Sequence, residues 1–307
     1  MSESGLKQIS LVAANFKNHE TFASVLDDWF TFLGGKPGEV VVVDGGSDAK
    51  THQMYWELFN AGKIDKLQVI RREHPENHKD LCFIQEHTAG AIAAKPYLLW
   101  FKSDTLPYRQ GHENWLDEAI GYLDREDTFA IGGSFNIPSK HHDAPFPGWY
   151  FSHKCSENFS LMKRSSFAAA MEEFAGRYIA SGFQGASPAD PTGQARYLVE
   201  VAWEKYIERH QKYTLVKEED PTWTVFHTNV LGEKLVKVRE DYIARRNIEK
   251  FMNAGVKPKP VQPLLGGSYY GQPRKRWAEL RVAVGGSALG PAWRALKRAL
   301  GLGRVAQ

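Results

Sequence analysis

The stretch that decides the fold reads VVVVDGGS over residues 40–47, four valines followed by an aspartate, two glycines and a serine. Consecutive β-branched residues predict a strand, Val40–Val43, that is buried on both faces, as in parallel sheets covered by helices. Asp44 follows this strand directly, and the two glycines after it let the backbone approach a ligand closely. We expect Asp44 to accept hydrogen bonds from a nucleobase or ribose and Ser47 to cap the next helix. The alternative is a turn in which both side chains only cap that helix.

Strand-like and helix-like segments alternate along the first half of the chain. The expected strands are Ile9–Ala14, Val40–Val43, Leu67–Ile70 and Tyr97–Phe101, and the expected helices are His19–Leu33, Thr51–Ala61 and Leu81–Ala94. This order predicts an α/β fold with a mainly parallel central sheet flanked by helices and joined by right-handed crossovers. Ligands in such sheets bind beyond the carboxyl ends of the strands.

The second half of the chain is less regular. We expect helices at Trp115–Leu123, from Asp190-Pro191 to about His210, and at Glu233–Ala254, the last closed by Gly255. Expected strands are Phe129–Phe135, Phe159–Lys163, Thr214–Lys217 and Thr224–His227, with a loop over Ile137–Trp149. Residues 256–273, rich in proline and glycine, read as a linker.

Composition and charge narrow the class of protein. Of 307 residues, 42% are hydrophobic and 24% charged, which is typical of a globular domain. Two cysteines provide no disulfide framework, no signal peptide precedes residue 9, and no apolar run is long enough to span a bilayer. We therefore expect a cytoplasmic protein. Residues 271–307 carry eight basic side chains and one acidic one, a net charge of +7, which leaves −4 on residues 1–270 and argues against a nucleic-acid binder.

A second strand end, YLLWFKSD over residues 97–104, places Lys102 and Asp104 on one face because side chains alternate along a strand. Asp104 offers an oxygen ligand for Mg²⁺ or Mn²⁺ on a diphosphate, and Lys102 offers a direct charge for a phosphate oxygen. The alternative is a surface ion pair at a strand end.

Together these segments resemble the family 2 glycosyltransferases and their relatives of the GT-A fold. Three segments carry the resemblance. Residues 10–18 are similar to the opening strand and turn, and residues 43–48 to the second strand end, where an aspartate reads the base. Residues 90–104 are similar to the helix and strand that lead into the Asp-X-Asp motif. It covers about residues 8–230, and it implies a glycosyltransferase domain over residues 1–255, with a donor half at about 8–110 and an acceptor half at about 111–230. It also implies transfer from a nucleoside-diphosphate sugar to a glycan or lipid-linked acceptor, with inversion, in the synthesis of cell-surface polysaccharide or glycoconjugate. The implied nucleotide-sugar-binding residues are Ala14, Phe16, Asp44, Gly45, Ser47, Lys102, Ser103 and Asp104.

The chain departs from the family pattern at the metal motif. Lys102 replaces the motif's first aspartate, which leaves Asp104 as its one carboxylate, and the resemblance adds His227 as the family's late histidine. A metal site at Asp104 and His227 for Mg²⁺ or Mn²⁺ is therefore expected to be weak, or the enzyme works without metal. The resemblance also implies a catalytic base at Glu200, with Glu204 and Asp190 as alternatives.

Two further segments are expected to meet the acceptor. The loop over residues 140–150 is rich in aromatic side chains, and we expect Trp149 and Tyr150 to stack on its sugar rings. Residues 274–307 form a basic tail whose Trp293, Leu296 and Leu300 share one helical face, as in helices that lie on anionic membranes. We expect this tail to place the protein on the cytoplasmic face of a membrane.

Other functions remain open. A sugar nucleotidyltransferase or a dinucleotide-dependent oxidoreductase needs glycines after its first strand. Residues 13–17 read AANFK and contain none, which argues against both classes of enzyme. A catalytically degenerate module that binds nucleotide or glycan is the main alternative, since the first aspartate of the metal motif is missing.

Overall fold

The computed structural model describes residues 3–70, 81–133, 140–183, 199–218, 220–228, 230–246, 248 and 251–252. Asp190, Gly255, the expected linker 256–273 and the basic tail 274–307 lie outside the described residues. A short helix α1 (Glu3–Lys7) precedes the first strand of a nine-stranded sheet.

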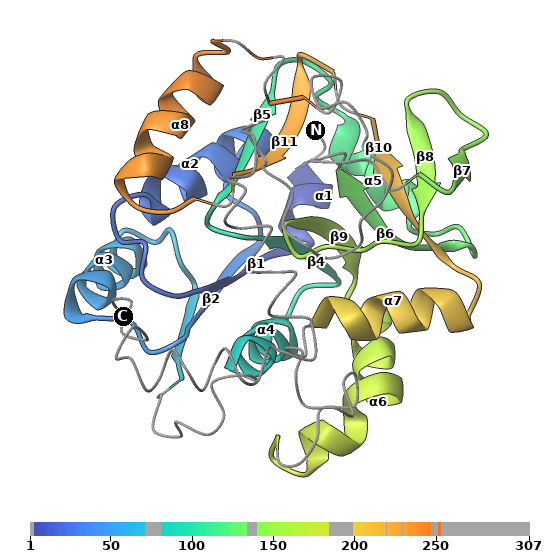
Figure 1. Cartoon of the computed structure of the whole chain (residues 1–307), viewed down its shortest axis with the longest axis horizontal. Coiled ribbons are helices and arrows are strands. Elements are labelled where there is room, and N and C mark those ends of the chain that lie inside the picture. The colour runs from blue at the N-terminus through green and yellow to red at the C-terminus, as the bar shows by residue number, and fades with distance from the viewer. Residues whose placement is uncertain are drawn as a thin grey trace, which may run out of the picture. The chain divides into compact units, whose positions relative to one another are not determined.

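The sheet has the order β3-β2-β1-β4-β9-β6-β10-β8-β7 (Figure 1). Its first four strands are parallel, namely β3 (Lys66–Val69), β2 (Glu39–Asp44), β1 (Ile9–Asn15) and β4 (Tyr97–Phe101). Strand β9 (Phe159–Lys163) runs antiparallel between β4 and β6 (Thr128–Gly133), and β6 is again parallel to β10 (Tyr213–Lys217). The hairpin of β7 (His142–Asp143) and β8 (Trp149–Ser152) forms the far edge. All these strands except β8 and β9 point the same way, so the predicted α/β fold with a mainly parallel sheet is confirmed.

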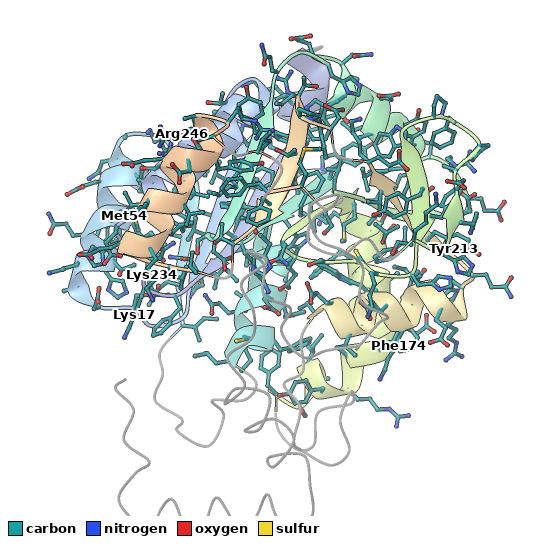
Figure 2. All side chains as sticks on the ribbon, turned by 45° about the horizontal axis from the view of Figure 1, so that its top comes forward. Lys17, Met54, Phe174, Tyr213, Lys234 and Arg246 are labelled. Carbon is teal, nitrogen blue, oxygen red and sulfur yellow. The ribbon has the colours of Figure 1, made fainter. Side chains whose placement is uncertain are left out.

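Helices cover both faces of the sheet because side chains on each strand alternate between them. One face packs on α4 (Leu81–Ile92), α6 (Arg164–Ala180) and α7 (Val199–Arg209), where Trp100 contacts Phe167 and Trp203. The opposite face packs on α2 (Phe22–Leu33), where Phe101 contacts Trp29. Side chains fill the space between these layers (Figure 2).

The strands and helices of the first half match the prediction to within a few residues, but one cap differs. Helix α3 (Ala49–Asn60) is capped by Asp48, whose carboxylate accepts a hydrogen bond from the backbone N–H of Thr51 at 3.0 Å. The expectation that Ser47 caps this helix is wrong, because its hydroxyl bonds Asp44 instead. Helix α2 ends at Gly34, whose φ of 81° is the left-handed conformation common after helices.

The second half departs further from the prediction. Helix α5 (Trp115–Tyr122) is close to its expected bounds, but α6 and a strand β5 (Thr105–Arg109) were not predicted. Strand β5 pairs antiparallel with β11 (Trp223–His227) in a separate two-stranded sheet.

Helix α8 (Glu233–Ile243) ends well before the expected Ala254. Arg245 terminates it with a φ of 55°, while its guanidinium donates to the carbonyl of Pro221 at 2.6 Å and lies over the ring of Tyr108. These contacts favour a left-handed arginine after Ala244, whereas the prediction has the helix continue to a closing Gly255. No described helix is long and apolar enough to cross a membrane.

Candidate active site

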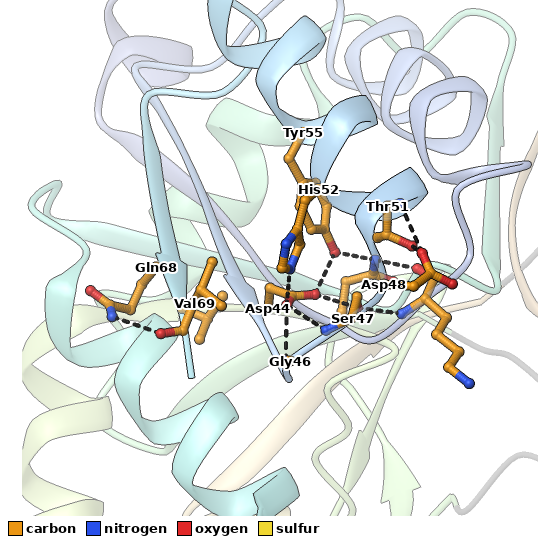
Figure 3. A network of polar contacts seen from close by, with 12 residues as sticks. Asp44, Gly46, Ser47, Asp48, Thr51, His52, Tyr55, Gln68 and Val69 are labelled. Carbon is orange, nitrogen blue, oxygen red and sulfur yellow. Dashed lines mark hydrogen bonds and ion pairs between the residues drawn. The ribbon is translucent and has the colours of Figure 1, made fainter. Parts of the chain in front are cut away.

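The Asp44 turn, at the carboxyl end of β2, is closed by its own hydrogen bonds (Figure 3). Oδ2 of Asp44 accepts the backbone N–H groups of Gly46 and Ser47 at 2.9 and 2.8 Å and contacts Nε2 of His52 at 3.1 Å. Oδ1 accepts the hydroxyls of Ser47 and, at 3.2 Å, Tyr55. The carboxylate is fully buried and already surrounded by donors, so it first holds the shape of the turn.

The two glycines of this turn serve different purposes. A Cβ on Gly45 would lie 2.7 Å from Oε1 of Gln85, whose amide donates to the carbonyls of Asn15 and Val43 at 2.5 and 2.7 Å. Gly46 has a φ of 79°, which favours glycine. The close approach at Gly45 is therefore made by a side chain of α4, which ties the ends of β1 and β2 together.

The opening turn after β1 contains two consecutive left-handed residues other than glycine, Lys17 with φ 60° and Asn18 with φ 69°. This conformation is uncommon, and neighbouring strand ends hold it. The N–H of Lys17 donates to Oγ of Ser47 at 2.7 Å, and Nδ2 of Asn18 donates to the carbonyl of Ser103 at 3.4 Å. The predicted residues Ala14 and Phe16, both partly exposed, border this turn.

The start of α8 also reaches the opening turn. The N–H of Gly232 donates to Oδ1 of Asn18 at 3.5 Å, and Lys17 and Lys234 lie on the same side of the molecule (Figure 2). The ends of β1, β2 and β4 and the start of α8 therefore meet at this turn.

Asp104 and His227 meet although 123 positions separate them, with Oδ2 and Nε2 3.2 Å apart. The pairing of β5 with β11 brings them together, because Thr105 lies opposite His227 in the register. The N–H and hydroxyl of Thr228 both donate to the carbonyl of Asp104 at 2.9 Å. The Asp104 side chain is 15% exposed and that of His227 is 11% exposed, so the pair is largely enclosed.

Lys102 leaves the end of β4 toward a different set of partners. Its Nζ lies 3.3 Å from Oε2 of Glu157, a residue at the turn before β9 that is 1% exposed. Glu86 of α4, also buried, and Glu200 of α7 complete a group of three carboxyls around this lysine. Glu157 meets the side chains of both Lys102 and Glu86, so a cation and a second carboxyl share its polar environment.

Burial and charge shift the pKa values in this carboxyl cluster, Glu86, Glu157 and Glu200 around Lys102. Burial raises the pKa of Glu86 to about 7, with Lys102 opposing the shift. Burial likewise raises the pKa of Glu157, and the nearby Glu86 raises it further against the influence of Lys102. Burial disfavours the charge on Lys102, but the attraction of Glu157, Glu200 and Glu86 outweighs it and raises the lysine pKa.

Glu200 is positioned by the turn that precedes β9. Its Oε1 accepts the hydroxyl of Ser156 at 2.7 Å and the backbone N–H of Glu157 at 2.8 Å. Glu204, one turn later on α7, is bound by Nζ of Lys154 at 2.8 Å. Of the predicted bases in the described ranges, Glu200 belongs to the carboxyl cluster, whereas Glu204 has a lysine partner of its own.

The expected sugar-stacking residues, Trp149 and Tyr150, are covered. Both belong to β8 and are 4% exposed, and the Trp149 ring packs against Tyr122 and lies under Nζ of Lys217. The expectation that these two rings offer open faces to an acceptor is therefore wrong. Strand β8 turns both side chains inward, whereas the sequence predicts a loop at this position.

A turn of three residues, Ser156-Glu157-Asn158, links these groups, and the sequence does not predict it as part of the site. Ser156 holds Glu200, Glu157 meets Lys102, and Nδ2 of Asn158 lies 3.1 Å from Nδ1 of His227. No sequence pattern marks this turn, and an acidic residue just before a predicted strand was the available signal.

The Asp104–His227 pair fits a divalent cation as two neighbouring ligands. Ligands about 2.1 Å from one ion at a right angle lie about 3 Å apart, close to the observed separation. Among the residues that the structure describes, no three His, Cys, Asp or Glu side chains are grouped to hold an ion. A cation here would therefore need further ligands from outside these two side chains.

No protein-family model and no curated protein matches the sequence. Solved structures with a similar chain path include GalNAc-T7 with UDP, GalNAc and Mn²⁺, at 12% identity and a TM-score of 0.47 over 85% of this chain. The chain spans about half, 47%, of that GalNAc-T7 chain.

Two further solved structures are similar to this chain. The mannosyltransferase PcManGT from Pyrobaculum calidifontis, with GDP-Man and Mn²⁺, has 14% identity and a TM-score of 0.44, covering 96% of this chain and 80% of its own. TarS 1–349 from S. aureus, with UDP-GlcNAc, has 13% identity and a TM-score of 0.44, covering 75% of this chain and 60% of its own. These values are low, so the likeness concerns the chain path and carries no chemistry over to this chain.

Proposed function

We propose that this chain is a glycosyltransferase of the GT-A type that moves a sugar from a nucleoside diphosphate to a glycan or lipid-linked acceptor. The observation that carries the proposal is the turn Ser156-Glu157-Asn158. It contacts the candidate base Glu200, the ammonium of Lys102 and the candidate metal ligand His227. Those three functions are what displacement of a diphosphate from a sugar requires.

The nucleoside side of the donor is assigned to the ends of β1 and β2. The Asp44 turn and the opening turn are joined there by Ser47, and His52 extends from the Asp44 carboxylate with a partly exposed ring. Since the Asp44 oxygens already have donors, Asp44 acts by fixing the turn, and a base contact at Asp44 itself would replace His52 or Tyr55.

The diphosphate side is assigned to the end of β4. The Lys102 side chain is 32% exposed, and its ammonium, positioned by Glu157, would supply the charge for a phosphate oxygen. A divalent cation at Asp104 and His227 would neutralise the same diphosphate. Ser103, whose carbonyl holds Asn18, joins this side to the nucleoside side.

The reaction is a single displacement at the anomeric carbon. The acceptor oxygen forms a bond to that carbon as the bond to the phosphate oxygen breaks, and the nucleoside diphosphate leaves with the electron pair. Glu200 accepts the proton of the acceptor hydroxyl, while Ser156 and the Glu157 N–H fix one of its oxygens. Attack from the face opposite the leaving group inverts the anomeric configuration.

The acceptor and location belong to the same proposal. The acceptor would be a lipid-linked glycan at the cytoplasmic face of a membrane. The basic side chains of residues 274–307 would bind the anionic lipid of that membrane. Asp190 stays an alternative base. Synthesis of cell-surface polysaccharide or glycoconjugate is the process that such a substrate implies.

The first experiment is a thermal-shift panel of UDP, GDP, dTDP, CMP and their common sugar conjugates, with and without Mn²⁺. A ligand of the native state must raise its stability, so one nucleotide should raise the melting temperature. No shift with any nucleotide at millimolar concentration would refute the donor site.

The second experiment compares Glu200→Gln with Glu204→Gln in a transfer assay using the nucleotide sugar so identified. We expect Glu200→Gln to lower kcat by about 10²-fold or more with donor affinity unchanged, and Glu204→Gln to have a small effect. Equal effects of the two variants would contradict the assignment of the base, and retention of anomeric configuration would contradict the single displacement. Donor binding with no transfer in the wild type would identify a degenerate binding module.

A further inference from the structure

The amide of Asn158 lies behind the imidazole of His227, on the side away from Asp104. Its Nδ2 is 3.1 Å from Nδ1 of the ring, and Nε2 of the same ring is 3.2 Å from Oδ2 of Asp104. Asn158 is 8% exposed, and its Oδ1 has no hydrogen-bond partner in the described part of the chain. A buried amide oxygen without a donor calls for an explanation.

The present contacts define one tautomer of His227. An amide NH₂ group only donates, so Nδ1 must be the unprotonated, accepting nitrogen. The proton of the neutral ring then sits on Nε2 and is donated to the Asp104 carboxylate. In this arrangement Nε2 has no lone pair for a cation.

Cation binding between Asp104 and His227 requires the other tautomer. Nε2 must present its lone pair, so the ring proton moves to Nδ1 and faces Asn158. The NH₂ group of Asn158 cannot accept that proton, whereas its Oδ1 can. Turning the amide by 180° exchanges the two atoms in the same space, so the oxygen gains a donor while the NH₂ group gives up its acceptor.

We propose that Asn158 is a two-position positioning residue for the cation site, donating to Nδ1 of His227 when the site is empty and accepting from Nδ1 when a divalent cation is bound. The inference rests on the proposed function for the presence of the cation. Each orientation makes one hydrogen bond to the ring, so the amide itself favours neither state. The group that faces Nε2 decides which tautomer of His227 forms, and the amide of Asn158 fixes the plane of the ring in both states.

The direct test observes the ring nitrogens by ¹⁵N NMR in the full chain, with the His227 signals identified by their loss in His227→Gln. Zn²⁺ is a suitable probe because it is diamagnetic and binds imidazole. We expect Nε2 to carry the proton without metal and Nδ1 to carry it at saturating Zn²⁺. The same tautomer in both states would overturn the proposal.

A second test uses Asn158→Asp, which can only accept and therefore favours the cation-binding tautomer in advance. We expect calorimetry to show Mn²⁺ binding on the order of tenfold tighter than in the wild type. Asn114→Asp, the same change at the residue before α5, controls for the added charge and should leave the affinity unchanged. Asp104→Asn should abolish the measured binding and so assign it to this site.

These outcomes separate the inference from the proposed function. Sugar transfer by a wild type that binds no Mn²⁺ would overturn the role of Asn158 and leave the transferase assignment standing. A tautomer change and a tightened Asn158→Asp variant in a chain that transfers no sugar would support the role of Asn158 alone. An Asn158→Asp variant that folds with wild-type Mn²⁺ affinity would refute it, and the wild-type NMR measurement decides if that variant does not fold.

Discussion

Replacing Glu86 by glutamine should change how the stability of the protein depends on pH. Glu86 is 4% exposed, its Oε2 accepts the N–H of Val199 at 3.3 Å, and it shares the carboxyl cluster with Glu157 and Lys102. Glutamine keeps the size of the side chain and an accepting oxygen, but it removes one titrating charge.

The magnitude follows from the pKa of Glu86, which burial raises from its ordinary 4.5 to about 7. Because the folded state holds this proton more tightly, the contribution is fully present below pH 4.5 and is lost as the pH rises through 7. The whole shift corresponds to about 3 kcal/mol, most of which is lost between pH 5 and pH 8. For a domain of this size, that difference is a change of about 5–10 °C in melting temperature.

The assay is urea unfolding and thermal melting of both proteins from pH 5 to pH 8. As the pH rises across this range, we expect the stability of Glu86→Gln to increase relative to that of the wild type by about 2–3 kcal/mol. The loss of one carboxylate beside Glu157 acts in the same direction. Glu172→Gln, at an exposed position of α6, should track the wild type. Parallel stability curves for the wild type and Glu86→Gln would refute the account of the cluster.

Three other variants test the frame of the site. Asp44→Asn should destabilise the fold by about 1–3 kcal/mol in urea unfolding, because the charge that holds the turn is lost, and should weaken nucleotide binding in calorimetry; unchanged nucleotide affinity would separate the turn from the donor. Gly90→Ala should cost about 1–3 kcal/mol, because its Cβ would lie 2.4 Å from the ring of Phe167, and a neutral effect on the melting temperature would disprove that packing. Arg239→Met should cost about 2 kcal/mol, since it breaks a two-pronged pair with Asp28 at 2.6 and 2.7 Å that joins α8 to α2. A melting temperature within 1 °C of the wild type would contradict that estimate.

The first half of the fold was predictable because its signals are local. Runs such as Val40–Val43 are buried on both faces, and the strand ends after them placed Asp44, Lys102 and Asp104 at one edge of the sheet. The sequence also suggested Asp104 and His227 as partners, through a family resemblance, and they lie 3.2 Å apart.

The remaining features depend on distant contacts. Strand β5 was missed because Pro107 argues against a strand, yet its pairing with Val225 in a two-stranded sheet accommodates it. Helix α6 has no clear apolar stripe, and its burial against α7 comes from the tertiary fold. Glu157 and Asn158 belong to a turn whose importance lies in neighbours from α7, β4 and β11, which no local pattern reveals.

The pairing of β5 with β11 has a consequence for the order of folding. Asp104 and His227 lie 123 positions apart, and bringing such distant segments together costs more chain entropy than closing the local turns. A ribosome delivers β1, β2 and β4 long before β11, so the Asp44 turn can close while the chain is still emerging. The contact between Asp104 and His227 can form only after residue 227 has been synthesised, so it comes late, when most of the sheet already exists.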